Sequence, residues 1–293
     1  MKLFRYLSLC ILLLFGGSGY SQKLISSGNN LVKVGNNLLF SSFFLPSDLS
    51  NLFQWIDLGS GVTLNGSDVS AITDRSGNSH NIDQTTGSQQ PLFIASDQNG
   101  KPSMQFDGVS ESIISTEASS VWKFLHDSND WTIYTVLKIT DANPDNVQTI
   151  FNTNDAGSIN VGIQIRYDDR SGSGKNDRIV TFISKGSAGN NIILDDAVDN
   201  VFTTQAYHIL TSIYDFNNVP NWETLVDNVQ ASTANNANLP HSAADPTETL
   251  EIAKNSGGQF LKGSISEWFI YDRLLTAGEN TQVINYINTK YDL

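Results

Sequence analysis

The feature that most constrains this chain is a stretch near its C-terminus, Lys262 to Tyr271, which alternates in the manner of a β-strand. Alternation assigns to one face Ile265, Glu267, Phe269 and Tyr271, and to the other Ser266, Trp268 and Ile270. Both faces carry large apolar groups. Such a strand belongs in the middle of a sheet that has material packed on each side. The stretch therefore predicts the central strand of a layered β protein.

A helix is expected directly after this strand. Thr276 and Glu279 have the spacing of a capping box, in which each residue satisfies a backbone N–H of the other. The apolar residues that follow at helical spacing are Val283, Ile284, Ile287 and Tyr291. One short amphipathic helix is therefore predicted to close the chain.

The composition favours strands joined by polar turns. Of the 293 residues, 39% are hydrophobic and only 16% are charged, and 22 are glycine. This length suits one large all-β domain. The formal net charge of −13 repels phosphate backbones and anionic lipid heads, so the composition argues against nucleic acid as a partner.

Residues 1–21 have the pattern of a signal peptide. Lys2 and Arg5 precede an apolar run from Tyr6 to Phe15, and small residues follow before Gln22. The run is shorter than the ~20 residues that cross a bilayer, so no permanent membrane span is expected. The pattern predicts an exported chain that is secreted or held at the cell surface.

Residues 22–50 are interpreted as an N-terminal arm. Asn29 to Gly35 and Asn36 to Phe40 form a short imperfect repeat, which predicts a hairpin with Gly35-Asn36 at its turn. Similar repeats occur in virion-attachment segments. A phage particle therefore stays open as an alternative location.

From residue 51 to 293 the motifs follow a familiar order. They are the strand Leu52 to Asp57, the turn Asp74-Arg75-Ser76-Gly77-Asn78, the turn Phe106-Asp107-Gly108, and a Gly-x-Ile-x-Glu-type strand ending in Tyr271-Asp272-Arg273. In this order they resemble laminin G-like, concanavalin A-like jelly-roll domains, although Ile72 stands where many relatives carry Trp. The resemblance implies an all-β, concanavalin A-like β-sandwich with a short C-terminal α-helix. It also implies the family's paired strands around Trp222, with Asp227-Asn228 at their turn.

The motifs of catalytic members of this fold class are missing. Retaining glucanases carry Glu-x-Asp-x-x-Glu on one strand, whereas Glu248 and Glu251 lack the aspartate and the spacing. The four histidines, His80, His126, His208 and His241, show no metal-binding spacing, and no Gly-x-Ser-x-Gly elbow is present. We therefore expect no enzyme, and rank a polysaccharide hydrolase or lyase last among the hypotheses.

Carbohydrate sites usually combine an exposed aromatic platform with amides and carboxylates. Trp222, beside the amide-rich loop Asn217 to Asn221, is the first candidate platform, and Tyr167 and Tyr214 are the next. An alternative is that Trp222 caps the core. Trp55, Trp131 and Trp268 lie in apolar strands and are assigned to packing.

Calcium is the one cofactor that the sequence suggests. Resemblance to calcium-binding laminin G relatives makes Asp168, Asp169 and Asp177 the candidate ligands, because carboxylates from loops suit this ion. A solvated acidic loop is the alternative.

These observations favour a non-catalytic extracellular recognition module that binds carbohydrate or a glycosylated surface. The second hypothesis is a structural or adhesive component of a cell surface or a phage virion.

Overall fold

The computed structural model describes residues 24–26, 29–34, 37–42, 44–140, 147–154, 161–170, 177–185, 191–195, 202–218, 222–234 and 242–293. The chain forms two compact units, Met1–Phe44 and Leu45–Leu293. The second unit thus begins a little before residue 51, where the domain was expected to start. The predicted signal segment 1–21 lies outside the described residues.

The first unit contains a small antiparallel sheet. Its strands are β1 (Leu24–Ser26), β2 (Asn29–Val34) and β3 (Asn37–Ser42). Val34 lies opposite Asn37, so the hairpin predicted from the repeat is confirmed.

The second unit is a mostly antiparallel β-sandwich built around β20 (Lys262–Tyr271). Every residue of β20 after Lys262 is buried. One edge of β20 pairs with β11 (Trp131–Ile139), and the other pairs with β9 (Ser103–Asp107) and then β4 (Leu52–Asp57). The predicted central strand is confirmed.

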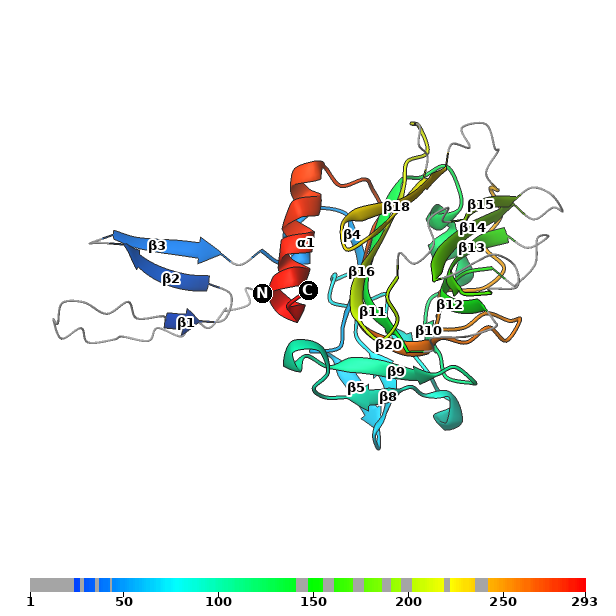
Figure 1. Ribbon diagram of the computed structural model, residues 1–293, viewed down its shortest axis with the longest axis horizontal. Coiled ribbons are helices and arrows are strands. Elements are labelled where there is room, and N and C mark those ends of the chain that lie inside the picture. Colours follow the sequence, from blue (N-terminus) through cyan, green and yellow to red (C-terminus); the bar gives the residue numbers. More distant parts are fainter. Residues whose placement is uncertain are drawn as a thin grey trace, which may run out of the picture. The chain divides into compact units, whose positions relative to one another are not determined.

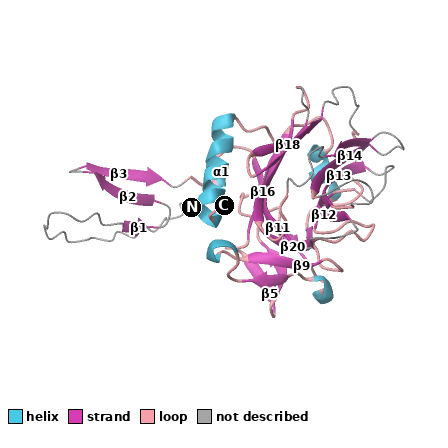
Figure 2. Cartoon of the chain, in the orientation of Figure 1, coloured by secondary structure: helices cyan, strands magenta, loops and turns pink. Residues whose placement is uncertain are grey.

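The sandwich has two layers, which Figures 1 and 2 show in the same orientation. The layer around β20 and β11 continues through β16 (Tyr207–Tyr214), β17 (Trp222–Val226) and β18 (Val229–Ala234). The facing layer contains β12 (Val147–Asn152), β13 (Val161–Asp168), β14 (Arg178–Lys185) and β15 (Asn191–Asp195). The other strands are β5 (Val62–Asn65), β6 (Asp68–Ile72), β7 (Ile82–Asp83), β8 (Leu92–Ile94), β10 (Ile113–Ser115) and β19 (Glu251–Ile252). The helices are η1 (Pro46–Asp48), η2 (Gly87–Gln89), η3 (Gln98–Gly100), η4 (Ser119–Leu125) and α1 (Ala277–Tyr291).

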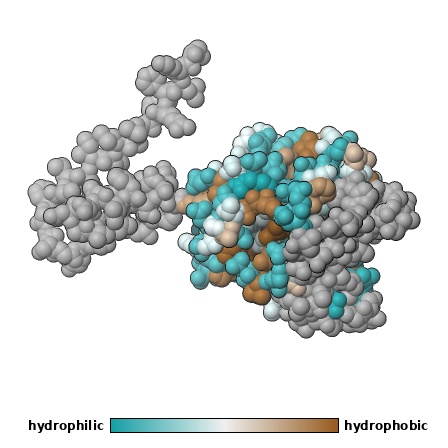
Figure 3. Space-filling model, turned by 90° about the horizontal axis from the view of Figure 1, so that it is seen from above, coloured by the Kyte–Doolittle hydropathy of each residue, from teal (hydrophilic) through white to brown (hydrophobic). Residues whose placement is uncertain are grey.

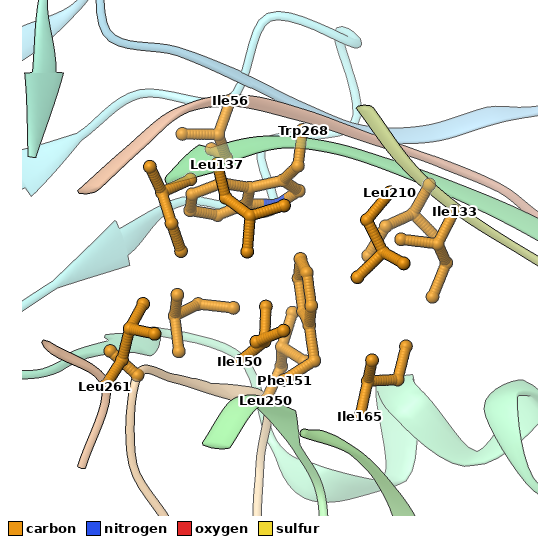
Figure 4. Packing of buried hydrophobic residues seen from close by; sticks show 14 of the residues in the cluster. Ile56, Ile133, Leu137, Ile150, Phe151, Ile165, Leu210, Leu250, Leu261 and Trp268 are labelled. Carbon is orange, nitrogen blue, oxygen red and sulfur yellow. The ribbon is translucent and has the colours of Figure 1, made fainter. Parts of the chain in front are cut away.

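The hydrophobic core fills the space between the layers. Figure 4 shows Ile56, Leu137 and Trp268 of one layer facing Ile150 and Phe151 of the other. All five side chains are fully buried. This shared core makes the two layers one folding unit.

One face assignment in the central strand was wrong. Ile265 lies in the core with Trp268, not on the face of Glu267. Val136 opposes Glu267 while Leu137 opposes Ile265, so Ser266 is the extra residue of a β-bulge. A bulge reverses the alternation of side chains beyond it.

Helix α1 covers the outer face of the β20 layer (Figure 1). Its predicted capping box is confirmed, because Thr276 N donates to Glu279 Oε2 at 2.8 Å and Glu279 N donates to Thr276 Oγ1 at 3.3 Å. The helix buries the predicted apolar stripe, which consists of Val283, Ile284, Ile287 and Tyr291.

A buried ionic cluster fixes the helix to the sheet. Lys290 Nζ lies 2.9 Å from Glu267 Oε2 and 2.9 Å from Asp57 Oδ1. The same Glu267 carboxylate accepts hydrogen bonds from the Tyr286 and Tyr291 hydroxyls at 3.0 and 2.9 Å. Burial raises the pKa of Glu267, and Lys290 opposes that rise.

The surface of the second unit shows no single apolar face in the part of the chain that the structure describes. Figure 3 shows hydrophobic residues interspersed with hydrophilic ones on one side. The exposed large apolar residues come from five separate segments: Leu45, Leu64, Val109, Val229 and Leu293. Among the described helices, none has the length and apolar character needed to span a bilayer.

Candidate functional site

A β-bulge at the start of β4 sets the position of Phe53. Gln54 opposes Ile270 and Leu52 opposes Tyr271, so Phe53 has no partner of its own across the strand pair. Bulges of this kind turn a side chain away from the ordinary alternation and are common next to binding sites. The Phe53 ring is half-buried at the edge of the core.

The turn predicted at Asp74 to Asn78 holds this bulge in place. Asn78 Nδ2 donates to the carbonyl oxygens of Leu52 and Phe53, at 2.8 and 2.9 Å. The two oxygens of the Asp74 carboxylate accept from Trp55 N at 2.9 Å and from His80 N at 3.0 Å. The turn therefore determines how Phe53 and His80 lie.

A buried glutamine connects the same region to the central strand. Gln54 Nε2 donates to the His80 carbonyl oxygen at 2.7 Å, and Gln54 Oε1 accepts from Trp268 Nε1 at 2.8 Å. Gln54 and Trp268 are both fully buried. A buried amide with satisfied partners on both sides makes a rigid support.

The result is an aromatic patch formed by Phe53, His80 and Phe124. The rings of Phe53 and His80 stack with centroids 4.2 Å apart and planes 19° apart. Phe124 packs on Phe53 at 4.5 Å, and the buried Trp122 meets Phe53 edge-on at 5.4 Å. The three patch residues are each half-buried, so apolar ring surface reaches solvent.

A pocket of about 480 Å³ opens beside this patch. Its lining consists of Asn51, Leu52, Phe53, Asn78, His80 and Asp272, and we call it the Phe53 pocket. Asn51, Asn78 and Asp272 are exposed at its rim. Its volume falls within the range of about 300–1,000 Å³ that is usual for small-molecule sites.

The His80 ring lines the pocket, whereas its Nδ1 atom is buried and has no hydrogen-bond partner among the described residues. The Glu117 Oε1 atom, 3.7 Å away, is close enough for charge attraction and too far for a direct hydrogen bond. The pocket thus offers apolar ring surface, two amides, one imidazole and one carboxylate.

The predicted aromatic platforms lie elsewhere, and the prediction was wrong for all three. Trp222, Tyr214 and Tyr167 are each at most 1% exposed. Trp222 Nε1 donates to Ser212 Oγ at 3.1 Å, and its ring meets those of Trp131 and Tyr214 edge-on at 5.6 Å. A ring that is enclosed on all sides cannot stack on a sugar.

Tyr167 is a core residue as well. It packs edge-on against Phe202 at 6.1 Å, and its hydroxyl donates to the Asp177 carboxylate. The alternative that Trp222 caps the core is therefore correct, and it extends to both tyrosines.

The structure does not gather the three candidate calcium ligands around one point. Asp168 is fully buried and its carboxylate accepts from Arg170 Nε and Nη2 at 2.8 and 2.7 Å. Asp177 N donates to Asp169 Oδ1 at 3.3 Å, which links those two residues. In the described ranges no group of three or more acidic, histidine or cysteine side chains could hold a metal ion. Calcium binding stays a prediction.

His208, in β16, has hydrogen-bond partners on both ring nitrogens. Its two ring nitrogens lie 2.7 Å from Asp227 Oδ2 and 2.9 Å from the Thr203 carbonyl oxygen. Burial alone would lower the pKa of His208, but the Asp227 carboxylate outweighs burial and raises it.

Sequence reasoning missed Asn51, Phe53, His80 and Asp272 as site residues. Alternation pairs Phe53 with the buried Trp55, and nothing in the sequence marks the bulge that separates them. One signal was available: His80 lies two residues after the Asp-x-Ser-Gly-Asn turn, and turns that follow a core strand often carry binding residues.

No family model and no curated protein matches this chain in sequence. Among solved structures, the binding domain of Paraclostridial Mosquitocidal Protein 1 matches with a TM-score of 0.56 at 14% identity, over 82% of this chain and 52% of that one. The binding domain of botulinum neurotoxin DC matches with a TM-score of 0.55 at 12% identity, over 80% of this chain and 51% of that one.

The sialidase of Trypanosoma rangeli also matches, with a TM-score of 0.54 at 11% identity, over 83% of this chain and 33% of that enzyme. The chain therefore spans about half the length of the toxin domains and a third of the sialidase. At these identities the likeness shows the fold alone. In fold, the second unit is a β-sandwich similar to those in toxin binding domains and in a sialidase.

Proposed function

We propose that the second unit is a non-catalytic recognition module that binds carbohydrate in the Phe53 pocket. The observation that carries this proposal is the pairing of the aromatic patch with the amides of Asn51 and Asn78 and the carboxylate of Asp272. Sugars present apolar C–H faces that pack on rings and hydroxyls that bond to amides and carboxylates. The pocket supplies both kinds of partner from a rigid support.

The structural neighbours support carbohydrate recognition in general and do not bear on which sugars the Phe53 pocket accepts. One similar toxin domain was solved in complex with SialylT, and the ligand-binding domain of botulinum neurotoxin serotype D, with a TM-score of 0.53 at 12% identity, was solved with N-acetylneuraminic acid. Together with the laminin G-like motif order, these neighbours favour glycan recognition. Membership of the laminin G-like family is part of the proposal, as is an extracellular or cell-surface location for the exported chain.

The composition of the pocket supports binding rather than hydrolysis. Two carboxyl groups flank the scissile bond in most glycoside hydrolases. Within the described parts of the chain, the lining of the Phe53 pocket holds one carboxyl group, that of Asp272. A bound sugar would therefore meet no acid–nucleophile pair there.

A glycan array followed by titration of the best ligand tests the proposal. Phe53→Leu keeps an apolar side chain at the bulge and removes the ring, so it should weaken binding at least roughly tenfold, the loss of about 1.4 kcal/mol of stacking and burial. Phe93→Leu is the matched control, because Phe93 also packs half-buried against the core but does not line the pocket. Equal affinities of both variants, or release of reducing ends from the bound glycan, would contradict the proposal.

Calcium enters the proposal only through the laminin G resemblance. If the ion binds near Asp168, Asp169 and Asp177, calcium should raise the melting temperature of the parent chain, and Asp177→Asn should reduce that rise. An unchanged melting temperature in saturating calcium would remove the ion from the account.

A further inference from the structure

We infer that the Phe53 pocket selects uncharged sugars and rejects acidic ones; the inference rests on the proposed function and names its ligand class. The charge of the lining is the first argument. Among the residues that the structure describes, Asp272 is the one acidic residue that lines the pocket, it is exposed, and no lysine or arginine lines it. An anionic ligand would meet a carboxylate without meeting a fixed cation.

Arg273, which directly follows Asp272, already pairs with other groups of the protein. The Arg273 guanidinium donates to both oxygens of Glu279, from Nη2 at 2.7 Å and from Nη1 at 2.9 Å. Its Nε donates to the Ser50 carbonyl oxygen at 3.0 Å. Bidentate pairing of this kind fixes the guanidinium and compensates its charge. Arg273 is therefore a poor partner for a ligand carboxylate.

Arg75, in the turn beside β4, also has partners within the protein. Arg75 forms an ion pair with Asp57, and its guanidinium lies 4.1 Å over the Trp55 ring. Glu117 Oε1 lies 3.7 Å from His80 Nδ1 and adds a second negative charge near the aromatic patch. The chain as a whole carries a formal charge of −13, which strengthens the negative potential.

The groups that line the pocket match those of a neutral hexose or N-acetylhexosamine. Its hydroxyls can donate to the Asp272 carboxylate and to Asn78 Oδ1, and its apolar face can pack on the aromatic patch. The Asn51 amide can both donate to a sugar hydroxyl and accept from one, whereas both hydrogens of Asn78 Nδ2 already bond to the backbone. A sialic acid or uronic acid would instead place its carboxylate against Asp272. Asp272 is exposed, so the dielectric around it is close to that of water. Across about 3–4 Å in such a medium, the repulsion costs an acidic glycan roughly five- to tenfold in affinity.

A matched pair of glycans tests this inference. The affinity of a neutral glycan with a terminal galactose should be compared with that of the same glycan capped by sialic acid, in one buffer of low ionic strength. We expect the neutral form to bind roughly five- to tenfold more tightly, and the gap to narrow at high ionic strength, which screens repulsion. Asp272→Asn should remove most of this difference in affinity, because it should strengthen binding of the sialylated glycan.

Asp292→Asn is the control, because it removes the same charge from an exposed aspartate that does not line the pocket. If the two variants change the gap equally, Asp272 does not determine selectivity and that part of the inference fails. Tighter binding of the sialylated form by the parent chain would overturn the inference and leave glycan recognition standing. Binding of neither form, with no other array glycan retained, would overturn the proposed function itself.

Discussion

Trp222 shows how strongly one ring contributes to this fold. It is buried against Trp131 and Tyr214, and its indole N–H is satisfied by Ser212. Trp222→Ala should therefore lower the free energy of unfolding by about 3–5 kcal/mol, through lost burial and a residual cavity. Urea denaturation followed by tryptophan fluorescence measures this. A variant that unfolds at the same urea concentration as the parent would show that the ring is not part of the core.

Glu279 should give the folded state a measurable pH dependence. The hydrogen bonds from Arg273 and then from the Thr276 backbone lower the pKa of Glu279 to about 2. A carboxylate with a depressed folded-state pKa stabilises the protein above its ordinary value near 4.5, and this contribution is lost as the pH falls towards 2. Glu279→Gln should therefore be less stable than the parent at neutral pH.

The difference in stability between Glu279→Gln and the parent should shrink steadily between about pH 4.5 and about pH 2. Thermal melts of both proteins across this range provide the test. Since glutamine can still complete a capping box, the comparison isolates the charge. A difference that stays constant down to the acid end would mean that the Arg273–Glu279 pair does not lower the pKa.

At the residue scale, prediction from sequence failed where long-range packing or a backbone irregularity decides the exposure of a ring. Trp222 stands beside an amide-rich loop and yet is buried, while Phe53 stands in an apolar strand and yet reaches the pocket. Periodicity describes regular strands, and the bulge at Phe53 interrupts the period. Its energetic cause, which includes the Asn78 hydrogen bonds, lies in a turn distant in sequence.

The packing of helix α1 on the sheet depends on the positive charge of Lys290, which compensates the carboxylates of Glu267 and Asp57. Removal of Lys290 would leave the buried Glu267 carboxylate close to Asp57 with only neutral donors around Glu267. Breaking a buried ion pair by removing one partner costs about 3–5 kcal/mol. We therefore expect Lys290→Met to lower the free energy of unfolding by this amount at neutral pH, as measured by urea denaturation.

Lys262→Met is the control for the helix prediction, because Lys262 is exposed on the same strand that carries Glu267. Surface substitutions of this kind usually change stability by less than about 0.5 kcal/mol. If Lys290→Met lowered the free energy of unfolding no more than Lys262→Met does, the ionic cluster would not anchor the helix.

The structural elements that are determined by residues close together in the sequence were predicted well. The capping box of α1 and its apolar stripe are properties of neighbouring residues. The hairpin from Trp222 turns at Asp227-Asn228, where both residues have positive φ, 51° and 61°, as a two-residue type I′ turn requires. Ile265 was misplaced because the bulge at Ser266 depends on pairing with β11, which is distant in sequence.

At the scale of the whole molecule, the all-β fold was predictable because many strands repeat the same pattern and their motifs occur in a known order. The site was not, because its parts come from β4, from the turn after β6, from η4 and from the residue after β20. Only the folded sandwich brings these segments together. A single strand or turn carries too little of the site to reveal it.

The most direct test of the account is NMR observation of the histidine rings during glycan titration. The chain has four histidines, and His80 lines the Phe53 pocket while His126 and His208 are buried elsewhere. With a glycan that the array identifies, we predict that the ring resonances of His80 shift and saturate along the binding curve. Those of His126 and His208 should stay in place. Saturable binding that leaves His80 unmoved would contradict recognition at this pocket.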